Sequence, residues 1–274
     1  MVVEHSVVVD GLRIHIVESG SGKPLLLLHG LGGPQMWERV IGPLSATFRV
    51  IVPDLPGFAD SQCGSVPYST DHFAEFIVQL LDTLELATAT IAGISYGAQI
   101  AVSCAYRFPQ RTDRLVLIAA TGLSAQRGVA LNDIRWSMFS GFMKRIVLRS
   151  QSILEILSRG SFYDIRNRPQ DLVERFYRQL LDEAKKNSWL IVLRNVFTPS
   201  PDFRQQVAGL RQPVLILWGE HDRAVSSKFA REFHRLIPQS TLHTIPECGH
   251  SMPLEKPDEV CEAIIMFAGV VSPK

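Results

Sequence analysis

Along the first 120 residues, short apolar runs alternate with longer segments in which apolar residues recur every three to four positions. The short runs have the length and composition of buried strands, and the longer segments have the spacing of amphipathic helices. The clearest helical pattern covers residues 70–86, where Phe73, Ile77 and Leu84 fall on one side. Such alternation is typical of a doubly wound parallel sheet. The strand-like runs lie at residues 2–9, 12–18, 25–28, 49–53, 88–92 and 115–120.

Two turns in this half of the chain are rich in glycine. Asp10-Gly11 separates the first two runs and is a strong signal for a tight β-hairpin. Residues 29–33, His-Gly-Leu-Gly-Gly, follow a strand, so a dinucleotide-binding loop has to be considered. That motif requires further glycines, and its two possible registers place Gln35 or Pro34 where glycine is needed. The loop therefore predicts no nucleotide cofactor.

The pattern changes between residues 121 and 208. No strand-like run appears there, and apolar residues such as Leu172, Phe176 and Leu180 recur at helical spacing. This segment holds 14 basic and 8 acidic residues, although the whole chain is nearly balanced at 28 and 27. We expect residues 121–208 to form a helical cap inserted into a sheet domain. That domain comprises residues 1–120 and 209–274, with strand-like runs resuming at 214–219 and 241–245 and helical patterns at 226–237 and 257–267.

Composition and charge narrow the classes of function. With 46% hydrophobic and 20% charged residues, the chain has the make-up of a soluble globular protein. Its net charge of +1 gives no electrostatic reason for a nucleic-acid partner. The N-terminal residues do not resemble a signal peptide, and no apolar run is long enough to cross a bilayer. The four cysteines lack zinc-site spacing. We expect a cytoplasmic protein with reduced thiols, no metal and no stable membrane insertion.

Candidate chemistry begins at the sequence Gly93-Ile94-Ser95-Tyr96-Gly97, which joins a strand-like run to a helical pattern. A strand that turns this sharply into a helix holds its central serine in strained backbone geometry, with the hydroxyl exposed at the carboxyl edge of the sheet. Glycine at positions 93 and 97 allows the close packing that the turn requires. Ser95 is therefore the candidate nucleophile.

A serine hydroxyl needs an adjacent base, and the base needs a group that orients it. His250 follows the strand-like run at 241–245, and Asp222 follows the run at 214–219. Because the carboxyl ends of parallel strands meet at one edge of the sheet, both side chains are expected near Ser95. The order Ser95, Asp222, His250 is the nucleophile–acid–base order of one hydrolase fold. We therefore predict a Ser-His-Asp triad.

Together these motifs resemble the α/β-hydrolase family from the first strands to the last helix. The resemblance implies a mostly parallel eight-stranded sheet, with helices on both faces and a helical cap inserted after strand 6. It rests on His29-Gly30, Asp54-Leu55-Pro56-Gly57-Phe58, the Gly-x-Ser-x-Gly turn, Trp218-Gly219-Glu220-His221-Asp222, and residues 249–257.

The resemblance also implies further site residues. The oxyanion hole would consist of the backbone N–H groups of Tyr96 and Leu31, whose side chains would remain free to shape the pocket. His29 would be structural, and neither a metal nor a cofactor is implied. Residues expected to line the substrate pocket are Gly32, Trp136, Phe139, Phe142 and Met252.

Three functions remain open. The chain looks most like capped carboxylesterases and monoacylglycerol-lipase-like enzymes, which implies cleavage of small to medium carboxylic esters through an acyl-enzyme. Ser95 stands where dehalogenases and epoxide hydrolases have an aspartate, which disfavours both. A carbon–carbon hydrolase of the meta-cleavage-product type would use the same triad, but such enzymes tend to carry Trp where this chain has Ser251. A ligand receptor on the same scaffold is the third reading. The acyl and alcohol preferences and the oligomeric state are not predicted.

Overall fold

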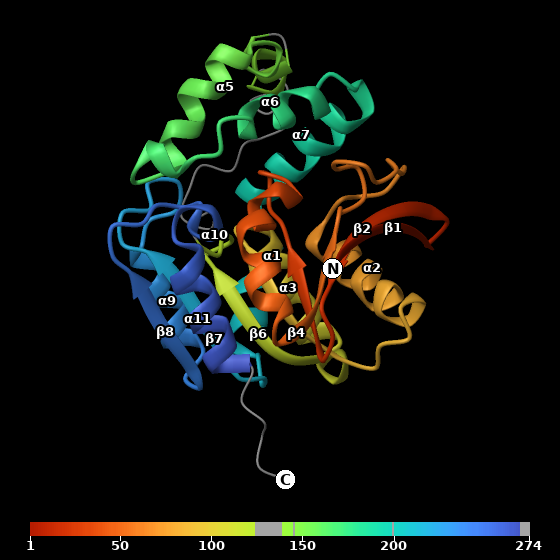
Figure 1. Ribbon diagram of the computed structural model, residues 1–274, viewed down its shortest axis with the longest axis vertical. Helices are drawn as coiled ribbons and strands as arrows, with labels where there is room; N and C mark the ends of the chain where they lie inside the picture. Colours follow the sequence, from red (N-terminus) through yellow and green to blue (C-terminus); the bar gives the residue numbers. More distant parts are fainter. Residues whose placement is uncertain (124–138, 145, 199, 269–274) are drawn as a thin grey trace.

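The computed structural model describes residues 1–123, 139–144, 146–198 and 200–268. Its centre is an eight-stranded sheet with the order β1-β2-β4-β3-β5-β6-β7-β8 (Figure 1). The pairs β1–β2 and β2–β4 are antiparallel, and every other neighbouring pair is parallel. The predicted architecture is confirmed. The strands are β1 (Val2–Val9), β2 (Leu12–Ser19), β3 (Lys23–Leu28), β4 (Phe48–Pro53), β5 (Ala89–Ile94), β6 (Thr112–Ile118), β7 (Val214–Gly219) and β8 (Ser240–Ile245).

The hairpin between β1 and β2 follows from its two turn residues. Asp10 and Gly11 have φ angles of 50° and 73°, and Val9 pairs directly with Leu12. Positive φ at both central residues gives the turn a twist that matches the twist of the strands. The predicted two-residue hairpin is confirmed.

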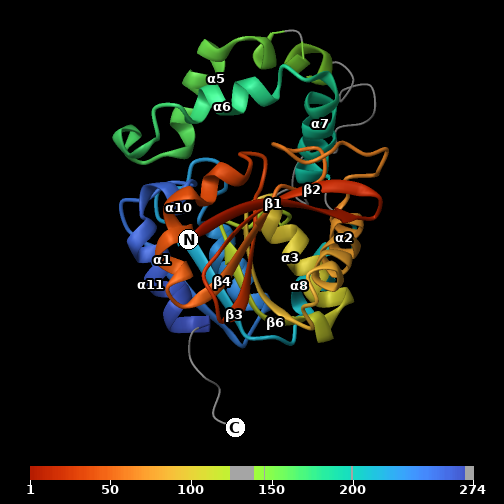
Figure 2. The ribbon, with the colours of Figure 1, turned by 45° about the vertical axis from the view of Figure 1, so that its right-hand side comes forward.

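Helices cover both faces of the sheet (Figure 2). In β3, Leu25 and Leu27 point into one hydrophobic cluster, whereas Leu26 and Leu28 point into the other. The first cluster is closed by α1, α10 and α11, and the second by α2, α3, α8 and α9. The helices are α1 (Glu38–Ser45), α2 (Thr70–Thr83), α3 (Tyr96–Arg107), α8 (Phe203–Ala208), α9 (Lys228–Leu236), α10 (Met252–Glu255) and α11 (Pro257–Ala268), with short 3-10 helices η1 (Pro34–Trp37) and η2 (Pro109–Arg111).

Helix α2 ends earlier than the apolar pattern predicts. The pattern extends to residue 86, but the helix stops at Thr83 because Glu85 adopts a φ of 55°. The Leu86 N–H then donates to the Leu81 carbonyl at 2.8 Å, which caps the helix and keeps Leu86 packed against the core.

A layer of helices follows β6 and lies over one edge of the sheet (Figure 1). It has a small hydrophobic core of its own, which includes Leu154, Val173 and Leu190. The predicted cap after β6 is therefore present, while its limits at 121 and 208 stay a prediction. Phe203 and Val207 of α8 pack into the core beneath the sheet. The cap elements are η4 (Val147–Arg149), α5 (Gln151–Ser158), η5 (Arg159–Ser161), η6 (Ile165–Asn167), α6 (Leu172–Gln179) and α7 (Glu183–Phe197).

No helix in the described ranges is both long and apolar enough to span a membrane.

The contact between α3 and β3 leaves no room for a side chain at position 97. A Cβ there would lie 2.2 Å from the Leu28 carbonyl oxygen. We expect Gly97→Ala to lower the free energy of unfolding by about 3 kcal/mol or more, because backbone atoms would have to separate. Gly42→Ala in α1 is the matched control: its Cβ meets nothing within 4 Å, so it should be neutral or stabilising. Urea denaturation of both variants tests this, and equal stability would contradict it.

Candidate active site

Ser95 lies at the turn between β5 and α3. It has φ 57° and ψ −114°, in the left-handed half of conformational space that non-glycine residues rarely adopt. Its N–H donates to the Ile118 carbonyl at 2.9 Å, and its carbonyl accepts from Ala98 N–H at 3.2 Å. These bonds hold the strained residue in place. The predicted sharp strand-to-helix turn is thus present at Ser95.

Asp222 and His250 are joined by a hydrogen bond. The Nδ1–H of His250 donates to Asp222 Oδ2 at 2.7 Å. The other oxygen of Asp222 accepts from the N–H groups of Ala224 and Val225, both at 2.8 Å. Asp222 is only 8% exposed, so its charge is held by these three donors rather than by bulk water. With Nδ1 as a donor, Nε2 of a neutral imidazole is left as an acceptor.

The loops that carry these residues meet at one edge of the sheet. Because β5, β6, β7 and β8 are successive parallel neighbours, Ser95, Asp222 and His250 all follow carboxyl ends of strands on that edge. The Asp222 and His250 loops are in direct contact, since a Cβ on Gly219 would lie 2.2 Å from the Gly249 carbonyl oxygen. The topology therefore places three residues that are far apart in the sequence on the same edge of the sheet, and a hydrogen bond joins two of them, Asp222 and His250.

The glycine-rich loop after β3 packs against the serine turn. A Cβ on Gly30 would lie 3.1 Å from Ser95 Cβ and 3.3 Å from the Tyr96 nitrogen. Within the described ranges, no acceptor is present for the N–H of Tyr96 or Leu31. The Leu31 carbonyl accepts from the indole N–H of Trp189 at 3.0 Å, which ties the loop to α7. The N–H of Tyr96 directly follows Ser95 in the chain, and the N–H of Leu31 directly follows Gly30, which packs against Ser95.

The side chain of Tyr96 does not shape the pocket, contrary to expectation. It is 1% exposed, and its hydroxyl donates to the Tyr68 carbonyl at 2.8 Å. The ring packs against Phe73 at 6.2 Å between centroids, in the core below the turn. The ring therefore points toward α2, and the backbone N–H is the part of Tyr96 left at the serine turn.

His29 is fully buried and connects two loops. Its Nδ1–H donates to the Gly30 carbonyl at 2.8 Å, while Nε2 accepts from Leu55 N–H at 3.1 Å. Burial lowers the pKa of His29 to about 4, and the bond to Gly30 only partly opposes that shift. The imidazole is therefore neutral at physiological pH, and both of its nitrogens are engaged in holding the backbone.

A cavity of about 260 Å³ lies between the cap and the edge of the sheet. No described residue lining it has an ionisable side chain. It touches Leu31 and Gly32 beside the serine turn and Ser251 next to His250. The lining is completed by Gln35, Met36, Met143, Val147, Leu148, Leu154, Leu157, Ser158, Ser161, Phe162, Leu172, Val173, Phe176 and Trp189.

Of the five predicted pocket residues, Gly32 lines this cavity. Met252 is fully buried in the hydrophobic cluster closed by α1, α10 and α11, Phe139 packs against the cap core, and Phe142 is 52% exposed. Trp136 lies outside the described residues. Most of the cap lining was not predicted from the sequence, although the helical spacing of Leu172 and Phe176 was a usable signal. Spacing identifies an apolar face, but it does not show whether that face meets a cavity or another helix.

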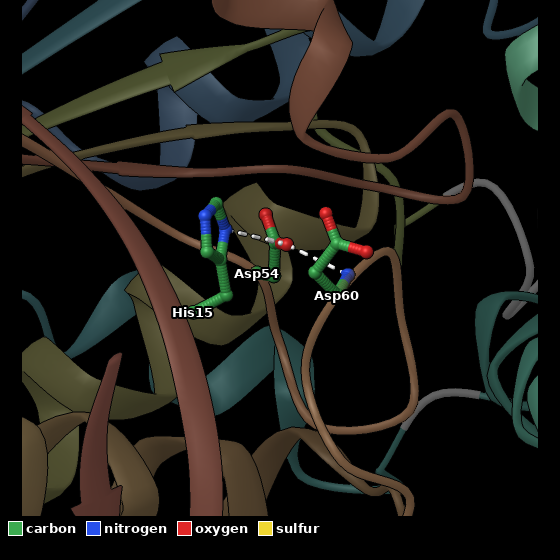
Figure 3. Close-up of side chains that lie close together, drawn as sticks. All are labelled: His15, Asp54 and Asp60. Carbon is green, nitrogen blue, oxygen red and sulfur yellow. Dashed lines mark hydrogen bonds and ion pairs between the residues drawn. The ribbon is translucent and has the colours of Figure 1, made fainter. Parts of the chain in front are cut away.

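A second group of titratable side chains, His15, Asp54 and Asp60, lies beside β2 (Figure 3). Its potential metal-ligating atoms are within 4.8 Å of one another. Asp54 Oδ2 accepts from His15 Nδ1 at 3.0 Å and from Asp60 N–H at 2.9 Å. Burial raises the pKa of Asp54 to about 6, against the lowering effect of these two donors. The contacts that are present fix the loop after β4 against β2.

We expect His29 to make stability depend on pH. The folded imidazole stays neutral down to about pH 4, whereas the unfolded one takes up a proton near pH 6.5. The free energy of unfolding of the parent should therefore decrease by about 3 kcal/mol as the pH falls from 6.5 to 4, because the unfolded state takes up this proton and the folded state does not. Glutamine does not titrate, so the stability difference between the parent and His29→Gln should narrow by that amount. Urea denaturation across this range measures it, and a constant difference would contradict the assignment.

Comparison with known proteins shows to which protein family the chain is similar. A model of the alpha/beta hydrolase fold family matches residues 23–257. A 2-hydroxy-6-oxo-2,4-heptadienoate hydrolase from Pseudomonas putida is 29% identical over 266 residues, covering 91% of this chain and 90% of that protein. A membrane phospholipase A described as a bacterial virulence factor superposes with a TM-score of 0.83 at 27% identity, covering 97% and 85% of the two chains. A carboxylesterase from Bacillus subtilis superposes with a TM-score of 0.77 at 23% identity, covering 99% and 93%. The chain therefore belongs to the alpha/beta hydrolase fold family.

Proposed function

We propose that this protein is a serine hydrolase that cleaves carboxylic esters with an apolar acyl group. The observation that carries the proposal is the hydrogen bond of 2.7 Å between His250 and Asp222, at the sheet edge where Ser95 ends β5 in a strained turn. A histidine oriented in this way has a free Nε2 that can accept a proton, which a serine nucleophile requires.

In this mechanism Ser95 Oγ attacks the ester carbonyl carbon while His250 Nε2 takes the hydroxyl proton. The bond to the alcohol oxygen then breaks, and His250 returns the proton to the leaving alcohol. Water repeats the sequence on the acyl-enzyme and releases the acid. Asp222 stabilises the imidazolium that forms in each half-reaction and holds the ring in the required tautomer.

The negative charge that develops on the carbonyl oxygen would be received by Tyr96 N–H and Leu31 N–H. Tyr96 N–H lies at the start of α3, where the helix dipole favours negative charge. Leu31 belongs to the loop that packs against the serine turn. One such donor typically contributes about 3 kcal/mol to transition-state stabilisation.

A carbon–carbon hydrolase is the second candidate, and the named activity of the relative from Pseudomonas putida favours it. Its substrate class, a vinylogous diketone acid, carries a carboxylate. Among the described residues that line the cap cavity, there is no lysine, arginine or histidine that could pair with this carboxylate. Burying the carboxylate there without a partner would be costly. The cavity therefore favours an uncharged apolar group, which suits an acyl chain.

A receptor on this scaffold is a third possibility of a different class. It would retain the fold and the His250–Asp222 bond but would bind its ligand without sustained turnover. Multiple-turnover hydrolysis is therefore the property that separates an enzyme from a receptor here.

We expect Ser95→Ala to lower kcat by about a millionfold for p-nitrophenyl butyrate, because removal of the nucleophile abolishes the acyl-enzyme route. Ser45→Ala, at a partly exposed residue of α1 whose hydroxyl donates to the Gly42 carbonyl, is the matched control and should leave kcat unchanged. Steady-state kinetics and labelling with a fluorophosphonate provide the measurement. If Ser95→Ala turned over nearly as fast as the parent, the proposed mechanism would be wrong.

The cavity also predicts a dependence on acyl length. From acetate to hexanoate esters, kcat/KM should rise about fourfold per methylene, because each buried methylene contributes about 0.8 kcal/mol. Val173→Phe, which narrows the cavity from α6, should flatten this series, whereas Ile156→Phe at an exposed position of α5 should not. Faster turnover of a ring-fission dienoate than of every ester tested would instead support the carbon–carbon hydrolase.

A further inference from the structure

The loop that carries His250 is bonded directly to the cap. The carbonyl oxygen of Ser161 accepts from His250 N–H at 2.9 Å and from Ser251 N–H at 3.0 Å. The two backbones are in close contact here, since a Cβ on Gly249 would lie 2.8 Å from the oxygen of Ser161 and from the nitrogen of Tyr163. The position of His250 therefore depends on a cap segment.

A buried carboxylate completes this connection. Glu255 Oε1 accepts from the N–H groups of Tyr163 and Asp164 at 2.7 and 2.8 Å. Its other oxygen, Oε2, accepts from Gly249 N–H at 2.9 Å. Glu255 is 4% exposed and lies in the short helix α10, at the junction of cap and sheet (Figure 1). One side chain thus joins the cap segment to the residue directly before His250.

The same cap segment reaches the loop of Asp222 and the cavity. The ring of Tyr163 stacks on His221 with 4.6 Å between centroids and 25° between planes, and His221 immediately precedes Asp222. Ser161 and Phe162 line the cap cavity, as does Ser251. Residues 161–164 therefore contact the supports of both His250 and Asp222 and also form part of the cavity wall.

We propose that Glu255 is a positioning residue that sets the location of the His250 imidazole through the cap segment 161–164. This inference rests on the proposed function, because positioning the imidazole matters for catalysis only if His250 is the base. Glu255 itself contacts no reacting atom. The consequence is that occupation of the cap cavity and proton transfer at His250 are coupled: a group that displaces residues 161–162 also displaces the base. A misplacement of about 1 Å is enough to cost about a hundredfold in rate.

The chemistry requires a carboxylate at position 255. Two oxygens without hydrogens can accept all three N–H donors, and ionised acceptors make the stronger bonds. A glutamine has the same shape but turns an NH₂ group toward one of these donors. Glu255→Gln therefore breaks the junction while removing little volume.

We expect Glu255→Gln to lower kcat for p-nitrophenyl acetate about tenfold or more, with KM changed less than twofold. The small acetyl group makes little use of the cavity, so a loss confined to kcat reports on the base rather than on binding. Fluorophosphonate labelling of Ser95 should slow by a similar factor. Glu259→Gln, at a half-exposed carboxylate one turn along the chain in α11, is the control and should change neither rate.

A second pair of variants tests the same junction while leaving Glu255 in place. Tyr163→Pro removes both the ring and the N–H that bonds to Glu255, whereas Tyr163→Ala removes only the ring. We expect kcat to be several-fold lower in Tyr163→Pro than in Tyr163→Ala, and this pair decides the question if Glu255→Gln fails to fold.

Unchanged kcat in folded Glu255→Gln, or equal kcat in the two Tyr163 variants, would overturn the positioning role. Full activity of Ser95→Ala would instead overturn the proposed function, so the two failures are distinguishable.

Discussion

The site depends on backbone-to-backbone contact between a strand and the helix that follows it. A Cβ on Gly93 would lie 2.3 Å from the Gly97 carbonyl oxygen, and a Cβ on Gly97 would lie 2.2 Å from the Leu28 carbonyl oxygen. Because positions 93 and 97 are both glycine and carry no Cβ, α3 can lie close enough to the sheet for the chain to reverse direction within one residue. That residue is Ser95, and the reversal explains its positive φ.

Buried carboxylates fix the loops along this edge of the sheet, and each of them accepts at least one bond from a backbone N–H group. Asp222 accepts two such bonds besides the one from His250, and Glu255 accepts three. Asp54 does the same further along the sheet edge, with one backbone donor and His15. Leaving a buried carboxyl group without partners is costly, which favours the loop conformations that keep these bonds.

The cap is attached to the sheet domain by polar contacts at both sides of its cavity. On one side Trp189 donates to the Leu31 carbonyl, and on the other side Ser161 accepts from the His250 loop. Between these contacts the described lining is mostly apolar and uncharged.

Local sequence patterns predicted the secondary-structure elements and their order along the chain. Strand positions, the Asp10-Gly11 hairpin, the insertion of a cap after β6 and the serine turn follow from local patterns, because a strand, a tight turn or a helix is dictated by residues close along the chain. The order of candidate residues also placed Ser95, Asp222 and His250 after strands that end at one edge.

The surroundings of each side chain, in contrast, follow from how the elements pack in three dimensions. Met252 and the ring of Tyr96 are apolar and near the motifs, yet both pack into the core, whereas Val173 and Phe176 line the cavity. The junction of Glu255 with residues 163 and 164 joins segments about 90 positions apart and has no local signature. Contacts of this kind depend on how the cap helices pack on the sheet, which periodicity along the chain does not encode.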